Sequence, residues 1–115
     1  MGKLPNHNRA VIPIEKLLYS LDPMHPTGRH KARVFRSALG FGLESIGVLE
    51  GMLRDGIATH EAEKLPSRAD GIERWMVEWI VIGRLGPLRM VSAWGQGRKD
   101  RVPRLLSCYL KQVKT

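Results

Sequence analysis

The chain has only one cysteine, Cys108, among its 115 residues, which excludes an internal disulfide. It has no run of the roughly 18 apolar residues that a membrane helix requires, and residues 1–10 show no apolar segment of signal-peptide type. The four histidines lack metal-site spacing, and neither a Gly-rich phosphate loop nor a nucleophile elbow is present. We therefore expect a cytoplasmic protein that needs no metal, no cofactor and no membrane.

Acidic residues are scarce as well: 11 Asp and Glu stand against 19 Lys and Arg, for a net charge of +8. Residues 1–36 hold seven basic and two acidic residues, 37–73 hold three and seven, and 74–115 hold nine and two. If the two basic ends fold together, they form one positive surface of the kind that binds a phosphate backbone. We expect RNA as the partner; the alternative is a charge that serves only solubility.

The first half of the chain has helical periodicity. Apolar residues three and four apart predict a helix over 13–21, begun by Pro13. A second helix is expected from an N-cap at Thr27 to a stop at Gly40, and a third over 43–60.

The second half changes to the two-residue period of strands. Strands are predicted over 73–82, 88–94 and 102–110, and residues 9–12 are a candidate fourth. Helices followed by strands indicate an α+β fold, with two or three N-terminal helices packed on a C-terminal antiparallel sheet of three to four strands. The length suits a single domain over residues 1–115.

One motif at the start of the second predicted helix gathers groups that suit phosphate chemistry. It reads His-Pro-Thr-Gly-Arg-His-Lys over residues 25–31. The cationic side chains of this helix are Arg29, His30, Lys31, Arg33 and Arg36. Helix amides and these cations are able to hold a phosphate, while His25 is able to move a proton near neutral pH. The alternative is a solvated helix start with incidental charges.

Polar side chains interrupt two of the predicted strands. The two-residue period places Ser92 and Trp94 on one side of their strand, and Ser107 and Tyr109 on one side of the next. If this face is open, these residues line a shallow groove for a nucleotide, with Trp94 or Tyr109 stacking on its base. Arg89 and Arg104 stand near its rim. If the face is packed, Trp94 belongs to the core.

Three large or soft side chains are expected inside the protein. Trp75 and Trp79 fit a hydrophobic core. Cys108 alternates to the side opposite Ser107 and Tyr109, where a small buried hydrophobe is favoured over a nucleophile.

Several segments together resemble a known bacterial family. They are residues 10–13, the motif His-Pro-x-Gly-x-x-Lys-Ala over 25–32, and residues 86–88, 91–94 and 103–109. The resemblance is to short bacterial proteins of unknown function that are similar to toxin-associated domains. The order of helices before an antiparallel sheet is also similar to the barnase, EndoU, colicin and RelE ribonuclease group. By fold-level analogy, this implies a toxin that acts on RNA.

These features favour a metal-independent endoribonuclease of bacterial toxin type. In this hypothesis His25 acts as base or acid, and Lys31 and Arg104 stabilise the phosphate. Ser107 and Tyr109 orient the substrate or handle protons. A cognate inhibitor protein is a candidate partner, and the oligomeric state is left open.

Two other classes remain open from the sequence. One is a non-catalytic nucleic-acid- or protein-binding module, such as an accessory or antitoxin-like partner, which needs only the charge. The other is an assembly or immunity protein whose acidic middle helix docks a partner. Turnover of RNA separates the enzyme from both.

Overall fold

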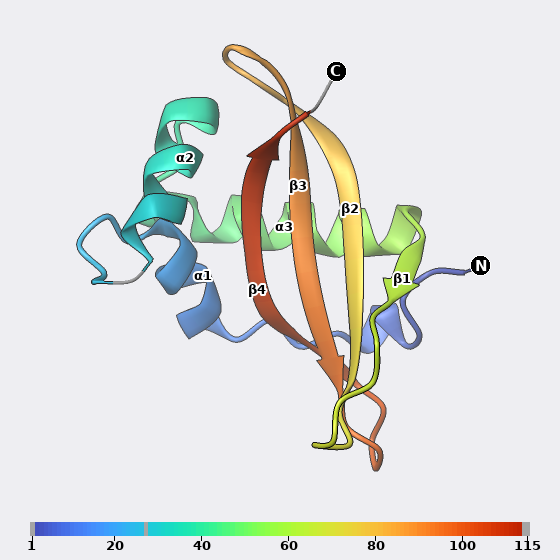
Figure 1. The fold of residues 1–115 in the computed structure, drawn as a ribbon. Coiled ribbons are helices and arrows are strands. Elements are labelled where there is room, and N and C mark those ends of the chain that lie inside the picture. Colours follow the sequence, from blue (N-terminus) through green and yellow to red (C-terminus); the bar gives the residue numbers. More distant parts are fainter. Residues whose placement is uncertain (1, 27, 114–115) are drawn as a thin grey trace.

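The computed structural model describes residues 2–26 and 28–113. Within these residues, three α-helices precede a four-stranded sheet (Figure 1). The helices are α1 (Ile14–Leu21), α2 (Arg29–Leu39) and α3 (Ile46–Thr59), with short 3₁₀ helices at His7–Arg9 and Leu43–Ser45. The strands are β1 (Ala62–Lys64), β2 (Glu73–Gly83), β3 (Gly86–Gln96) and β4 (Pro103–Gln112).

The sheet is an antiparallel meander in the order β1-β2-β3-β4. Its centre is the hairpin of β2 and β3, which pair from Glu73↔Gln96 to Gly83↔Gly86. Gly86 has a φ of 124°, a conformation that L side chains rarely adopt, so a glycine closes the turn.

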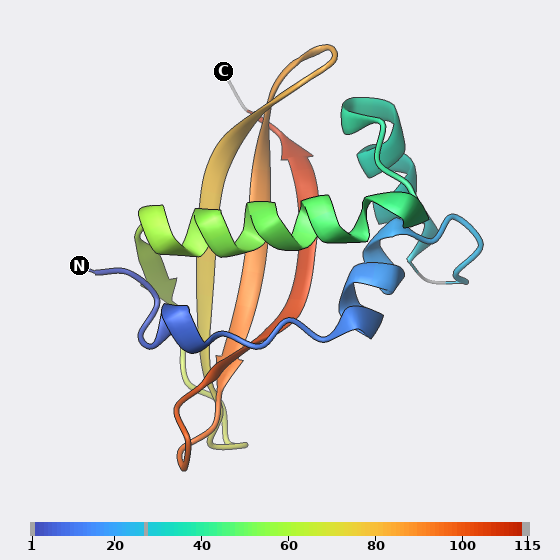
Figure 2. The same cartoon turned by 180° about the vertical axis from the view of Figure 1, so that it is seen from behind.

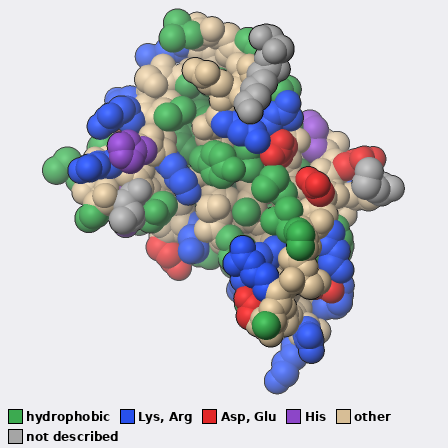
Figure 3. All heavy atoms as spheres, viewed as in Figure 1, with side chains coloured by type: hydrophobic (Ala, Val, Ile, Leu, Met, Phe, Trp, Pro, Cys, Tyr) green, Lys and Arg blue, Asp and Glu red, His purple; other side chains and the backbone are tan. Residues whose placement is uncertain are grey.

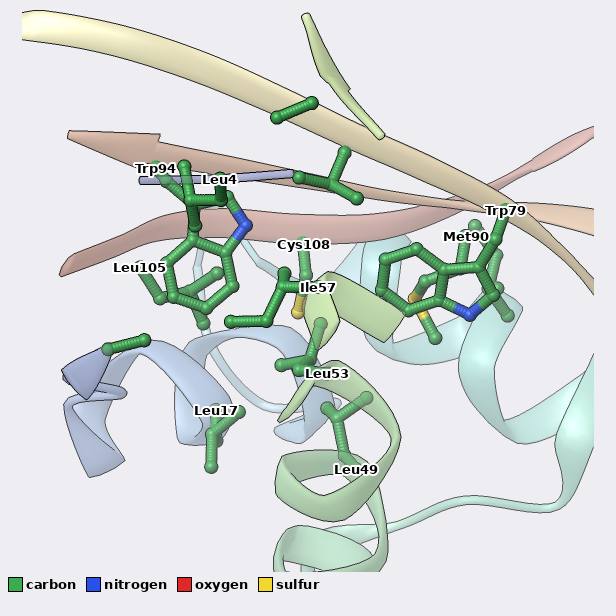
Figure 4. Close-up of a cluster of buried hydrophobic side chains, with 14 of the residues drawn as sticks. Leu4, Leu17, Leu49, Leu53, Ile57, Trp79, Met90, Trp94, Leu105 and Cys108 are labelled. Carbon is green, nitrogen blue, oxygen red and sulfur yellow. The ribbon is translucent and has the colours of Figure 1, made fainter. Parts of the chain in front are cut away.

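None of the three helices covers one of the two faces of the sheet. Helix α3 crosses the opposite face with the N-terminal segment running beside it, while α1 and α2 lie at the β4 edge (Figure 2). Leu49, Leu53 and Ile57 repeat every four residues along α3, so they form one buried stripe. This stripe packs on core side chains of the sheet such as Trp94 and Cys108 (Figure 4).

The N-terminal segment is attached along β4 and the loop before it. Val11 forms an isolated parallel bridge with Arg104, and the Asn6 side chain donates to the Arg101 carbonyl at 3.0 Å. The amide of Gln96, which is buried, donates to the carbonyls of Pro5 at 2.9 Å and Arg101 at 3.0 Å. The start of the chain is therefore held by residues about 90 positions later, as the separations of 95 and 91 residues show.

The predicted α+β class and the order of helices and strands are confirmed. The prediction of a fourth strand over 9–12 is wrong, because that segment makes a single bridge and the fourth strand is β1 on the other edge. Pro13 follows directly and has no N–H for a longer ladder. Thr27, expected to cap the second helix, lies outside the described residues, and Gly28 precedes α2.

The core assignments also agree with the structure. Trp79 and Cys108 are buried, and Trp75 packs against the core with its indole N–H donating to the Gln96 side-chain oxygen at 2.9 Å. In the part of the chain that is described, no helix is long and apolar enough to cross a membrane.

Candidate functional site

The face of the sheet turned away from α3 is left uncovered by the described helices (Figure 3). Strand register arranges its side chains in rows: Met76, Ala93 and Ser107; then Glu78, Val91 and Tyr109; then Ile80, Arg89 and Lys111. Apolar groups gather in the middle of this face, with cations around them (Figure 3). Because neighbouring strands lie about 4.8 Å apart, the Cα atoms of Glu78 and Tyr109 are about 10 Å apart. We call these three rows the sheet-face site.

A carboxylate stands between two cations in the sheet-face site. Arg89 Nη1 lies 3.4 Å from one oxygen of Glu78, and Lys111 Nζ lies 3.5 Å from the other. The Glu78 side chain is 26% exposed, so the group is reachable from solvent. A carboxylate accepts protons and the two cations bind anions, so this cluster has the parts for proton transfer beside a phosphate.

A second cluster forms where α1 and α2 meet the edge of β4. Lys31 Nζ lies 5.3 Å from the ring centroid of Tyr19 and 5.5 Å from that of Tyr109, within cation–π range of both. The His25 ring packs edge-on against Tyr19 with 4.5 Å between centroids. Three residues predicted to act together, His25, Lys31 and Tyr109, are thus connected through Tyr19.

Helix α1 is fixed to this edge by a buried hydroxyl. The Ser20 hydroxyl donates to the Cys108 carbonyl at 3.2 Å, and its oxygen lies 3.5 Å from the Cys108 sulfur. Burial raises the pKa of the Cys108 thiol, so the thiol stays protonated at neutral pH. This agrees with a packing role for Cys108.

His25 has a defined hydrogen bond on one ring nitrogen. The Gly28 N–H donates to His25 Nδ1 at 3.1 Å, so a neutral imidazole carries its proton on Nε2. A Cβ at Gly28 would overlap the Tyr19 backbone carbonyl, which is why glycine stands there. In this state the lone pair of Nδ1 is engaged by the Gly28 N–H, and the predicted role of His25 as base or acid stays a prediction.

The remaining predicted residues on the sheet separate into near and far positions. Ser107 lies one row from Tyr109 on the same face, and Arg89 lies one row away on the other side. Arg104 stands further along β4, opposite Gly95, and pairs with Asp100 at 3.3 Å. The Val102 N–H and Arg104 lower the pKa of Asp100, which keeps that pair charged. Arg89, not Arg104, is therefore the arginine next to Tyr109.

The expectation that Ser92 and Trp94 line the open groove is wrong. Both side chains are 0% exposed, and they lie on the α3 side of the sheet. The Ser92 hydroxyl donates to the Val77 carbonyl and accepts from the Trp94 indole N–H, each at 2.9 Å. The two-residue period correctly gave them a common side, but it did not say which side faces solvent.

Apart from Lys31, the basic residues of α2 are exposed to solvent. Arg29, His30 and Arg33 are exposed, as expected for contacts with a polyanion. Contact between Lys31 of α2 and Tyr109 of β4 brings parts of the two basic ends of the chain together.

Sequence reasoning missed Glu78, Lys111 and Tyr19. Glu78 had a readable signal, because it is one of only two acids in residues 74–115 and alternates with apolar residues in its strand. Lys111 and Tyr19 had none, since strand register and helix docking place them.

Among the residues that the structure describes, no group of three or more His, Cys, Asp or Glu side chains could hold a metal ion. In comparisons with known proteins, one family profile matches residues 3–112, and its description is "Domain of unknown function (DUF6883)". No curated protein and no solved structure matches the chain.

Proposed function

The chain belongs to the DUF6883 family, and from that premise we propose that it is an RNA-binding, metal-independent endoribonuclease of bacterial toxin type. The observation that carries the proposal is the row of Glu78, Val91 and Tyr109 on the sheet face that the described helices do not cover, flanked by Arg89, Lys111 and Lys31; Val91 is buried, and Glu78 and Tyr109 on either side of it are half-buried.

In the proposed reaction the RNA supplies its own nucleophile. A phosphodiester on the sheet-face site competes with Glu78 for Arg89 and Lys111. The Glu78 carboxylate then accepts the proton of the ribose 2′-OH, whose oxygen attacks the adjacent phosphorus. The bond to the 5′ oxygen breaks, and that oxygen takes a proton from the Tyr109 hydroxyl or from a protonated His25 imidazole. The products are a 2′,3′-cyclic phosphate and a 5′-hydroxyl.

Cations at both ends of the row support this chemistry electrostatically. Arg89 and Lys111 on one side and Lys31 on the other stabilise the charge that the phosphate gains in the transition state. Ser107, one row away, is placed to orient the ribose. If the protein is a toxin, a cognate inhibitor protein is a further partner. The proposed location is the cytoplasm, where the enzyme would encounter RNA.

The test is cleavage of total RNA by the purified chain in the presence of a chelator. We expect cutting without added metal, and Glu78→Gln should lower the rate by about 100- to 10,000-fold, the usual contribution of general acid–base catalysis. His25→Ala should also lower it. Glu15→Gln is the matched control, since Glu15 is exposed and outside the described ion pairs. RNA that stays intact with the native chain across many substrates removes the enzyme proposal.

A second candidate is a nucleic-acid-binding module without catalysis. Its specific support is that both oxygens of Glu78 already contact cations, Arg89 and Lys111, so an ion pair explains this carboxylate without a catalytic role. Binding of RNA that is tight but unchanged by Glu78→Gln, with no products, is the result that favours this candidate.

A further inference from the structure

Three arginines form a basic face on α2 outside the sheet-face site. Arg29, Arg33 and Arg36 follow each other at spacings of four and three residues, so they project from one side of the helix. They line a pocket of about 310 Å³ together with Leu21, Pro23, Ala32 and Ser37. We call this the arginine pocket.

The arginine pocket has no internal source of negative charge among its described lining residues. Five other arginines have acidic partners, namely Arg54 with Glu50, Arg74 with Asp70, Arg89 with Glu78, Arg101 with Glu73 and Arg104 with Asp100, whereas no ion pair is described for Arg9, Arg68, Arg84 and Arg98. Among the described residues, no ion pair within 4.0 Å involves Arg29, Arg33 or Arg36, and the Glu44 carboxylate lies with the Arg36 guanidinium beside Gly42. Like charges at this helical spacing repel each other, and a bound anion would reduce this repulsion.

The arginine pocket and the sheet-face site lie on different sides of α2. At 100° per residue, Arg29 and Arg33 are about 160° to 200° away from Lys31 around the helix axis. Lys31 faces Tyr109 and the sheet edge, whereas the arginines face the end of α1 at Leu21 and Pro23. A polyanion that touches both must cross the exposed outer surface of α2, where His30 is exposed.

From this geometry we infer that the arginine pocket is a second phosphate subsite, which holds the backbone of the same single strand several nucleotides away from the sheet-face site. Guanidinium forks match phosphate oxygens and remain charged at every relevant pH, which suits three arginines to this role. The inference rests on the proposed RNA-binding function and adds to it a length requirement.

The length follows from the width of a helix. An α-helix with its side chains is about 10–12 Å across, and a strand advances about 3.4 Å per nucleotide when stacked. Half the way around such a helix is about 16–19 Å, so about five nucleotides separate the two sites. Because arginine contacts to phosphate carry no sequence or sugar information, this subsite should hold DNA as well as RNA.

The experiment measures binding of fluorescent 4-mer and 12-mer single strands, in RNA and in DNA, over a series of salt concentrations. The test variant is Arg29→Gln with Arg33→Gln, which keeps good helix formers in α2. The control is Arg9→Gln with Arg68→Gln, which removes the same charge at exposed positions away from the pocket. Circular dichroism checks that both fold.

For the 12-mers, the test variant should lower the slope of log affinity against log salt by about 1.4, because each lost phosphate contact on a single strand contributes about 0.7. The effect should be equal for RNA and DNA and smaller for the 4-mers, which are too short to reach both sites at once, and the control should leave the slope nearly unchanged. Equal losses in the test and control variants, or a loss on the 4-mers as large as on the 12-mers, overturn the subsite. If the protein does not cleave RNA, the binding measurements with DNA still test the subsite. Absence of cleavage therefore counts only against the enzyme proposal.

Discussion

Some charged residues of this protein form ion pairs, and others do not. Asp70 and Arg74 form the shortest ion pair described, at 2.7 Å, and Arg74 together with the Ile72 N–H lowers the pKa of Asp70 from 3.8 to about 2. This pair fixes the loop before β2, whereas the arginines of α2 have no such contact. At this scale, the arginines with a described ion pair contribute to the structure, and the arginines of α2 are the ones for which we propose a ligand.

The Asp70 pair predicts an acid-dependent loss of stability. Because the folded-state pKa is lowered, the contribution is present above about pH 4 and is lost as the pH falls towards 2, where folded Asp70 takes up its proton. We expect the free energy of unfolding of Asp70→Asn to fall less than that of the native chain between pH 4 and pH 2. Urea unfolding across this range measures it, with Asp55→Asn as control; a native titration midpoint for Asp70 near 3.8 by NMR contradicts the pairing.

Among the elements, helix α3 shows how a weak helix former is kept by tertiary contacts. It contains Gly47, Gly51 and Gly56, each of which disfavours a helix relative to Ala. Gly56 is required, because a Cβ there would overlap the indole of Trp79, which passes directly over the helix backbone. Gly51 has nothing within 4 Å of that position. The helix therefore approaches β2 closely at Gly56 and faces open space at Gly51.

This contrast gives a matched pair of substitutions on one helix. Gly56→Ala should destabilise the fold by about 1–3 kcal/mol, because the added methyl displaces Trp79. Gly51→Ala should stabilise it by up to about 1 kcal/mol through helix propensity. Urea denaturation followed by tryptophan fluorescence measures both changes. A neutral or stabilising Gly56→Ala would show that Trp79 does not pack as described.

Periodicity was enough to predict the main helices and strands, because each element buries one regular face. The stripe of Leu49, Leu53 and Ile57 and the alternation of Ser107 and Tyr109 are local signals. Which face of the sheet α3 covers is a long-range outcome, and so Ser92 and Trp94 could not be placed.

The candidate site was only partly readable for the same reason. His25, Lys31 and Tyr109 come together through Tyr19, which belongs to a different element and carries no motif. Glu78 meets Lys111 across 33 residues through strand register, which a single sequence does not display.

Across the whole molecule, one buried side chain joins three distant segments. Gln96 accepts from the Trp75 indole of β2 and donates to the carbonyls of Pro5 and Arg101. It links the N-terminal segment, the central hairpin and the loop before β4, so these parts are expected to unfold together.

Gln96→Ala should destabilise the protein by roughly 1–3 kcal/mol, because three part-buried polar groups lose their partner. Gln112→Ala, at an exposed end of β4, should change stability by less than about 0.5 kcal/mol. Chemical denaturation gives both values. If the two substitutions cost the same, Gln96 does not have the connecting role described.

The attachment of the N-terminal segment also sets an order of events during synthesis. Residues 5–11 are synthesised well before their partners Gln96, Arg101 and Pro103, which follow about 90 positions later in the chain. The buried Leu4 has no finished surface to enter until then. A nascent chain that stops before β4 therefore lacks both Tyr109 and the closed core, and the protein acquires its native shape only once translation has passed the last strand.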